Sequence, residues 1–205
     1  MKIHSLILFL IFSSCVPSLA EKIDPKAQFE LGAKYEAGRG VKKDFAKALE
    51  LYRSAAEAGY APAQSTLGYF YLYGEGVKED FQEAFRWNLK AAEAGDSWGQ
   101  LNVGVQYDEG SGVPEDNVKA NAWYQKAAEQ GQARAQLNLG VNYWNGEGIE
   151  KDYVKAYNIL NHVRMTAPEP ALRWKARNVL DQLKKVMSEQ QIKEAGVNLK
   201  SRFGY

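Results

Sequence analysis

The chain has 205 residues, with 26 basic side chains, 25 acidic side chains and a single cysteine. This near balance of charge, together with the lack of a basic cluster, argues against a nucleic-acid-binding surface and against a patch that binds a membrane surface. A chain of this length can bury a core of its own without the help of disulfides.

The N-terminus has the features of a secretory signal. One basic residue, Lys2, precedes the apolar run from Leu6 to Phe12, and this run is too short to span a bilayer as a mature helix. Small residues at Ser18 and Ala20 occupy the positions that a signal peptidase reads. We therefore expect a signal peptide over residues 1–20, cleavage after Ala20, and a periplasmic or secreted protein without a membrane span.

A lipoprotein signal is the competing interpretation. Ser13 and Ser14 precede Cys15, which a lipid anchor would modify at the mature N-terminus, although Phe12 stands where leucine is usual. Cleavage after Ala20 instead removes the only cysteine. The mature chain then has no disulfide, and apolar burial has to stabilise it.

The rest of the chain is built on a repeat of about 36 residues that runs without insertion. The eight positions that mark the first unit recur in register in the next three. They are Gln28, Leu31, Gly32, Tyr35, Gly38, Gly40, Asp44 and Ala48 in the first unit, and Gln136, Leu139, Gly140, Tyr143, Gly146, Gly148, Asp152 and Ala156 in the fourth.

Each unit predicts a helix, a tight loop and a second helix. Leu31, Gly32 and Tyr35 have helical spacing on one stripe, and Gly38 can take the left-handed conformation that ends a helix. Asp44 precedes the second helix, where its carboxylate can accept from free backbone N–H groups. Asp80 with Glu83 also has the spacing of a capping box.

The second helices carry small residues that allow close approach, such as the pair at 55–56, and glycines at 59, 95 and 131 end them. Such hairpins bury their faces only by stacking on one another. The sequence therefore predicts an all-α fold, an α/α solenoid. It forms a single domain over residues 21–205, with repeats at 26–61, 62–97, 98–133 and 134–169.

The pattern Ala-Gln-x-x-Leu-Gly-x-x-Tyr-x-x-Gly-x-Gly-Val-x-x-Asp, followed by Ala-Ala-Glu-x-Gly, resembles the Sel-one-like repeat family. It covers most of residues 26–155, and the third unit departs from it at Gly99, Val103 and Asn117. The resemblance implies a tetratricopeptide-like superhelix whose first helices line a concave groove.

The tail, residues 170–205, fills one more period without the double glycine, and we interpret it as a degenerate capping repeat. Ser188 is its expected N-cap. Ile192, Ala195 and Leu199 are its expected buried stripe.

The sequence predicts no catalytic site, no metal and no cofactor. The glycine loops lack the lysine–hydroxyl pair of a phosphate-binding loop, and His162 is the single histidine that follows the signal. Asp108 and Glu109 are adjacent on a helix and point in different directions, so we interpret them as solvated helix-end acids and not as a glycosidase pair. Relatives assigned β-lactam hydrolysis have paired cysteines, and these are absent here.

First-helix residues that do not repeat are the candidates for function, because the tyrosines that repeat (Tyr35, Tyr71, Tyr107 and Tyr143) are assigned to the core. Aromatic side chains supply contact area, and polar ones set the register of a bound peptide. The alternative is that some of these aromatics pack between repeats. The predicted groove residues are Phe29, Tyr69, Tyr73, Trp98, Glu109, Arg134, Trp144 and Asn145.

We hypothesise a non-catalytic protein-interaction scaffold or adaptor of the bacterial cell envelope or secreted space, which binds a protein or peptide in this groove. Binding of cell-wall glycan, or a structural envelope role, is the alternative, because sugars also stack on exposed aromatic rings. Hydrolysis of β-lactams is the least supported hypothesis.

Overall fold

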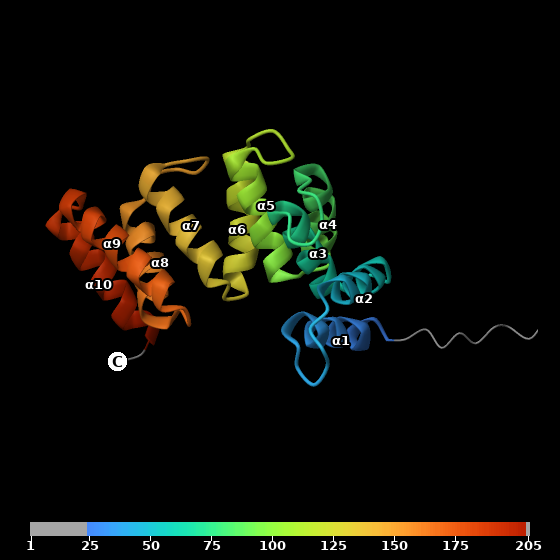
Figure 1. The fold of residues 1–205 in the computed structure, drawn as a ribbon. Helices are drawn as coiled ribbons and strands as arrows, with labels where there is room; N and C mark the ends of the chain where they lie inside the picture. Colours follow the sequence, from blue (N-terminus) through green and yellow to red (C-terminus); the bar gives the residue numbers. More distant parts are fainter. Residues whose placement is uncertain (1–23, 204–205) are drawn as a thin grey trace, which may run out of the picture.

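The computed structural model describes residues 24–203, with side chains up to Gly196, and this part of the chain is helical without strands. Its helices form hairpins that stack into a curved array with α1 at one end and α10 at the other (Figure 1). The predicted signal peptide, Cys15 and the cut after Ala20 lie outside the described residues. The helices are α1 (Pro25–Ala37), α2 (Phe45–Glu57), α3 (Ala61–Tyr73), α4 (Phe81–Glu93), α5 (Ser97–Glu109), α6 (Asn117–Glu129), α7 (Ala133–Asn145), α8 (Tyr153–Thr166), α9 (Pro170–Val186) and α10 (Glu189–Phe203).

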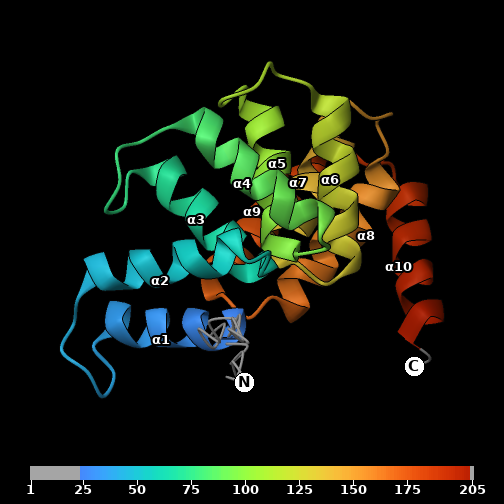
Figure 2. The same ribbon diagram turned by 90° about the vertical axis from the view of Figure 1, so that its right-hand side faces the viewer.

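The predicted solenoid fold is confirmed. In the first four hairpins each first helix packs along its own second helix, as α1 does along α2 (Figure 2), and each second helix packs on the first helix that follows it. In the C-terminal pair, α10 packs on α8. First helices of successive hairpins also touch, α3 with α5 and α7 with α9, whereas the second helices of the first four hairpins stand further apart. The first helices therefore lie on the inner side of the curve.

The repeated aspartates cap the second helices as predicted. Asp44 Oδ1 accepts from the backbone N–H of Lys47 at 3.0 Å, and Asp116 and Asp152 make the same bond at 2.9 Å. Gly38 ends α1 in the left-handed conformation with φ 68°, which also agrees with the prediction.

The capping box predicted at Asp80 forms only in part. Asp80 Oδ1 accepts from the N–H groups of Gln82 at 3.1 Å and Glu83 at 2.9 Å. The Glu83 carboxylate pairs with Arg86 instead of returning to the cap. The backbone N–H of Asp80 already donates to Tyr71 O at 3.0 Å, so it does not need that carboxylate.

The repeated glutamine joins one hairpin to the next. In three successive interfaces its side-chain amide donates to a backbone carbonyl near the end of the preceding second helix, beside small residues that are buried. The bonds are Gln64 Nε2 to Ala56 O at 3.0 Å, Gln100 Nε2 to Ala92 O at 3.3 Å and Gln136 Nε2 to Ala128 O at 3.1 Å.

The tyrosines that repeat are half-buried rather than fully buried. Each of them contacts a basic side chain of a second helix. Lysine ammonium groups lie 4.4 Å from the ring centre of Tyr35 and 5.3 Å from those of Tyr107 and Tyr143, while the Tyr71 hydroxyl accepts from Arg53.

Helical glycines set the distance between the two helices of a hairpin. A Cβ on Gly104 would lie 2.6 Å from ring carbons of Tyr124, which is completely buried. We expect Gly104→Ala to lower the free energy of unfolding by about 1–3 kcal/mol, the usual cost of overpacking, when measured by urea denaturation.

Gly196→Ala in α10 is the matched control. Nothing lies within 4 Å of a Cβ at this site, so the helix-favouring alanine should raise stability by up to about 1 kcal/mol. Equal effects of the two substitutions would contradict the close approach at Gly104.

The last two helices close the array. Ser188 caps α10 as predicted: its hydroxyl accepts from Gln191 N at 3.2 Å, and its own N–H donates to Gln191 Oε1 at 2.9 Å. Ala195 is buried in a cluster with residues of α8 and α9. The expectation for Ile192 was wrong, because its side chain is exposed, and the side chain of Leu199 lies outside the described part.

Truncation after Met187 tests this capping role. Removing α10 uncovers the apolar cluster that α8 and α9 share with Ala195, and we expect the melting temperature to fall by about 5 °C or more in a thermal scan followed by circular dichroism. An unchanged melting curve would show that α10 does not stabilise the array.

Candidate binding surface on the first helices

Four of the predicted groove residues form one exposed patch. Tyr69, Tyr73 and Trp98 are 41%, 58% and 47% exposed, and the two tyrosine rings lie 4.6 Å apart between centres. The guanidinium carbon of Arg134 lies 5.9 Å from the ring centre of Trp98, a cation–π distance. We call these four residues the aromatic patch, and they come from α3, α5 and α7.

The electrostatics of Tyr69 link the two ends of the patch. Its hydroxyl donates to Glu75 Oε1 at 3.3 Å. Partial burial raises the pKa of Tyr69, the Glu75 carboxylate and Tyr73 raise it further, and the charge of Arg134 acts in the opposite direction. Arg134, two hairpins further along, is therefore close enough to act on Tyr69, and the patch is continuous from α3 to α7.

Two predicted groove aromatics pack between helices instead. Phe29 is half-buried, with ring centres 5.2 Å from Tyr52 and 5.4 Å from Tyr60, so it joins the first hairpin to the second. Trp144 is half-buried against the C-terminal apolar cluster. For these two residues the structure matches the alternative of packing between repeats.

Glu109 and Asn145 are exposed at the C-terminal ends of α5 and α7, where each has a polar partner in the loop that follows. Glu109 Oε2 accepts from the Ser111 hydroxyl at 3.4 Å. Asn145 Nδ2 donates to Glu147 Oε1 at 3.0 Å, and Glu147 lines the pocket described next.

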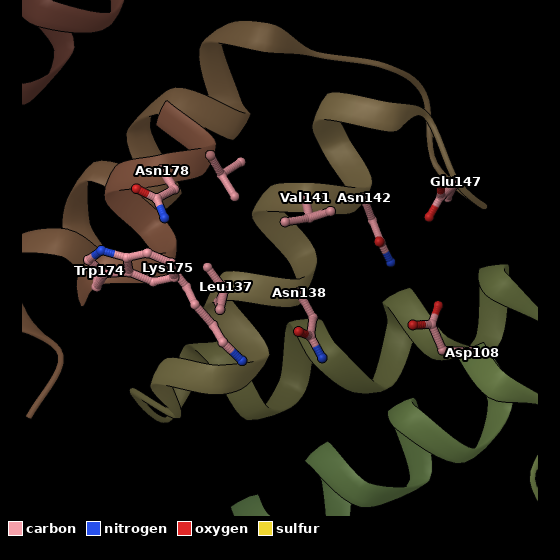
Figure 3. A pocket seen from close by; sticks show the side chains of 10 residues that line it. Asp108, Leu137, Asn138, Val141, Asn142, Glu147, Trp174, Lys175 and Asn178 are labelled. Carbon is pink, nitrogen blue, oxygen red and sulfur yellow. The ribbon is translucent and has the colours of Figure 1, made fainter. Parts of the chain in front are cut away.

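A pocket of about 400 Å³ lies between α7 and α9 and reaches the end of α5 (Figure 3). The carboxylates of Asp108 and Glu147 stand at one end of the view, and Trp174 stands at the other. The lining residues are Asp108, Leu137, Asn138, Val141, Asn142, Glu147, Trp174, Lys175, Asn178 and Val179.

The α9 side of this pocket was missed by the sequence analysis. Trp174, Lys175 and Asn178 lie where the repeat pattern decays, so no register assigned them to the groove. The one available signal was Trp174 itself, a large aromatic between Arg173 and Lys175, which is 65% exposed. Leu137 and Val141 lie on α7, a first helix, between the predicted groove residues Arg134 and Asn145.

Asp108 is not the fully solvated acid that the sequence suggested. It is half-buried, and Tyr124, which is completely buried, donates its hydroxyl to Asp108 Oδ2 at 3.3 Å. Burial raises the pKa of Asp108, and the nearby charges of Glu147, Glu109 and Glu115 raise it further, against the lowering effect of the Tyr124 hydrogen bond.

Within residues 24–203 no group of three histidine, cysteine, aspartate or glutamate side chains is arranged to hold a metal ion. Over the same residues, no helix combines the length and the apolar character that crossing a membrane requires.

Comparison with protein-family models identifies the repeat. The model described as the Sel1 repeat matches residues 25–60, 61–96, 99–132 and 133–160, which is well over half of the chain. The chain belongs to the Sel1 repeat family. Proteins of this family typically act as protein–protein interaction scaffolds and are generally non-catalytic.

Solved structures of Sel1 repeat proteins share the fold. A Sel1 repeat protein from Oxalobacter formigenes is 34% identical, with a TM-score of 0.66 over 80% of this chain and 74% of that one. A protective antigen present in uropathogenic Escherichia coli strains, which displays an SLR fold, is 29% identical with a TM-score of 0.58. That comparison covers 87% of this chain but only 45% of the antigen. The search of curated proteins gave no match.

The half-buried carboxylate of Asp108 should make the stability of this Sel1 repeat protein depend on pH. Because folding raises the pKa of Asp108 above its ordinary value of 3.8, its ionised form lowers the free energy of unfolding at neutral pH. That penalty grows as pH rises through 3.8 toward the raised value and is absent below 3.8.

We expect Asp108→Asn, which keeps an acceptor for Tyr124, to melt higher than the wild type at pH 7. The difference should shrink as the pH falls to about 4. Thermal scans across this range measure it. The exposed Glu93→Gln serves as a control that should not shift, and a variant that melts lower at pH 7 would contradict the assignment.

Proposed function

We propose that this Sel1 repeat protein is a non-catalytic scaffold of the bacterial cell envelope or secreted space, which binds another protein or peptide along the inner face of its solenoid. The observation that supports this most is the aromatic patch. Exposed tyrosine, tryptophan and arginine grouped on one face are the residue types that dominate binding energy at protein interfaces.

Stacking of the repeats does not require these residues. Other units carry smaller or polar side chains at the same places and form the same hairpins, so the aromatic patch has no counterpart elsewhere in the array. The places of Tyr69, Tyr73 and Trp98 are taken by Ala33, Ala37 and Lys26 in the first unit, and by Val141, Asn145 and Arg134 in the fourth.

Two points support an envelope or secreted location. The N-terminal sequence has the pattern of a signal peptide, with a lipid anchor at Cys15 as its alternative. The Escherichia coli relative is described as a protective antigen present in uropathogenic strains, which is compatible with such a location for this chain. Mass spectrometry of the mature N-terminus distinguishes cleavage after Ala20 from a lipid-modified Cys15.

Photocrosslinking in the native compartment tests the binding face. A photoreactive amino acid at the place of Tyr69 or Trp98 should capture a distinct protein partner, identified by mass spectrometry. The same group at Val118, an exposed apolar residue of α6 on the side of the second helices, should not capture it.

Capture of the same proteins from all three sites would contradict binding at the inner face. Purified peptidoglycan, offered against the same extract, addresses the glycan alternative. Retention of the protein on glycan alone, with no crosslinked protein, would replace the scaffold function by glycan binding.

A further inference from the structure

The pocket between α7 and α9 has a counterpart two repeats earlier in the same chain. A second pocket, of about 490 Å³, is lined by Glu36 and Glu75, which hold the repeat positions of Asp108 and Glu147. In both repeats a buried tyrosine donates to the first carboxylate: Tyr52 to Glu36 at 2.6 Å, and Tyr124 to Asp108 at 3.3 Å. We call these the first pocket and the third pocket, after their repeats.

The two pockets differ in where positive charge is found. Arg39 and Lys43 line the first pocket together with its carboxylates, so two basic side chains accompany the two acids there. In the third repeat the same two positions are Ser111 and Glu115, which remove both cations and add an acid. Lys175 is the one basic residue that lines the third pocket.

In Figure 3, Lys175 approaches the third pocket from α9, on the opposite side from Asp108 and Glu147. Its side chain extends toward Asn138 and does not reach the two carboxylates. Among the described residues no salt bridge reaches the acids of either pocket, so the two pockets differ in the basic side chains that line them and not in ion pairs. The acidic end of the third pocket is therefore short of positive charge in a way that its counterpart is not.

The rest of the third pocket is lined by the apolar side chains of Leu137, Val141, Trp174 and Val179, beside three asparagines and Lys175. Leu137 and Val141 lie between the carboxylates and Trp174, whose indole is largely exposed (Figure 3). An occupant that suits this arrangement has a cation at one end and an apolar group beside it. Arginine fits the acidic end best, because its guanidinium presents several N–H donors in a fixed plane and can donate to two carboxylates at once.

We propose that the third pocket binds an arginine side chain of a partner protein between Asp108 and Glu147, with a neighbouring apolar side chain of that partner packed on Leu137, Val141 and Trp174. This inference rests on the proposed function, since it names the chemistry of the partner that the inner face binds. Charge complementarity supports the proposal, because the third pocket lacks the two basic side chains, those of Arg39 and Lys43, that line the first pocket.

The ionisation of Asp108 agrees with this assignment. Burial and three neighbouring acids disfavour its charged form, and an arriving guanidinium relieves that cost. Tyr124 fixes one oxygen of the carboxylate and leaves the other for a ligand. Binding therefore returns the pKa of Asp108 toward its ordinary range and releases protons when the pH lies near the raised value.

The test uses two capped peptides, acetyl-Ala-Leu-Arg-Leu-Ala-amide and the same peptide with citrulline, a neutral isostere, in place of arginine. Binding to the mature protein is followed by isothermal titration calorimetry and by chemical-shift changes of the Trp174 indole N–H. We expect the arginine peptide to bind and the citrulline peptide to bind at least about tenfold more weakly, the effect of one charge-assisted hydrogen bond.

The matched pair of variants uses the two equivalent pockets. Asp108→Asn with Glu147→Gln should weaken the arginine peptide by about tenfold or more and abolish its preference over citrulline. Glu36→Gln with Glu75→Gln, the same change in the first pocket, should leave both affinities unchanged. Thermal scans of both double variants establish that they are folded.

The proposal is overturned if the arginine peptide does not bind at millimolar concentration, if citrulline binds equally, or if both double variants lose binding to the same extent. These outcomes are distinct from failure of the proposed function. A protein crosslinked at Tyr69 or Trp98 while the peptides show no charge preference would keep the scaffold and reject the arginine site. Absence of any crosslinked protein would reject the scaffold itself.

Discussion

The array depends on the contact between the end of one hairpin and the start of the next. At that contact two small residues, as at Ala55 and Ala56, allow the next first helix to approach closely, and the repeated glutamine donates to the carbonyl beside them. This buried bond discriminates between registers, because a buried amide left without a partner costs more free energy than the bond itself contributes. The glutamine therefore fixes the register of each interface, while the alanines fix its distance. Leu31 shows what happens without a preceding hairpin: it is 38% exposed, whereas its equivalent Leu67 is completely buried.

Buried amides also make the interfaces between successive hairpins different from one another. Asn88, completely buried, donates to Gln106 at 2.9 Å and accepts from Asn102 at 3.2 Å, while Asn142 donates to Asn121 at 2.9 Å in the next interface. The aromatic cluster of Tyr52 with Phe70 joins the first two hairpins instead. Because a buried amide opposite a ring would lose its hydrogen bonds, each interface accepts only its own neighbour. The order of nearly identical hairpins thus depends on residues outside the consensus.

The sequence predicted the scaffold well because its signals are local. Glycine at a left-handed helix end, aspartate at a helix start and small residues at close contacts act through their own few neighbours, and a period repeated four times leaves little choice of register. The outer end was less predictable: Ile192 has helical spacing appropriate for burial, yet its side chain is exposed. Asp108 illustrates the same limit, since its raised pKa depends on its burial in the folded array and on the charge of Glu147 from the following repeat.

The candidate binding surface was only partly predictable, because it depends on the twist of the array. The sequence analysis assigned both Phe29 and Tyr69 to the groove, but Phe29 packs against Tyr60 of the connection to the second hairpin. The twist also brings the C-terminal half of one inner helix near the N-terminal half of a later one. Tyr69 interacts with Arg134 in this way, and Asp108 lines one pocket with Trp174, each pair about two repeat lengths apart.

The aromatic patch and the third pocket are therefore two instances of one diagonal arrangement, shifted by one repeat along the solenoid. They share α5 and α7, with the aromatic patch extending back to α3 and the third pocket extending forward to α9. An extended partner that contacts both would cross the inner helices obliquely, meeting tyrosine and tryptophan rings first and the carboxylates of Asp108 and Glu147 later. Since the repeats fix the spacing of these features, an extended chain has one direction along the solenoid in which its apolar and basic side chains meet their complements.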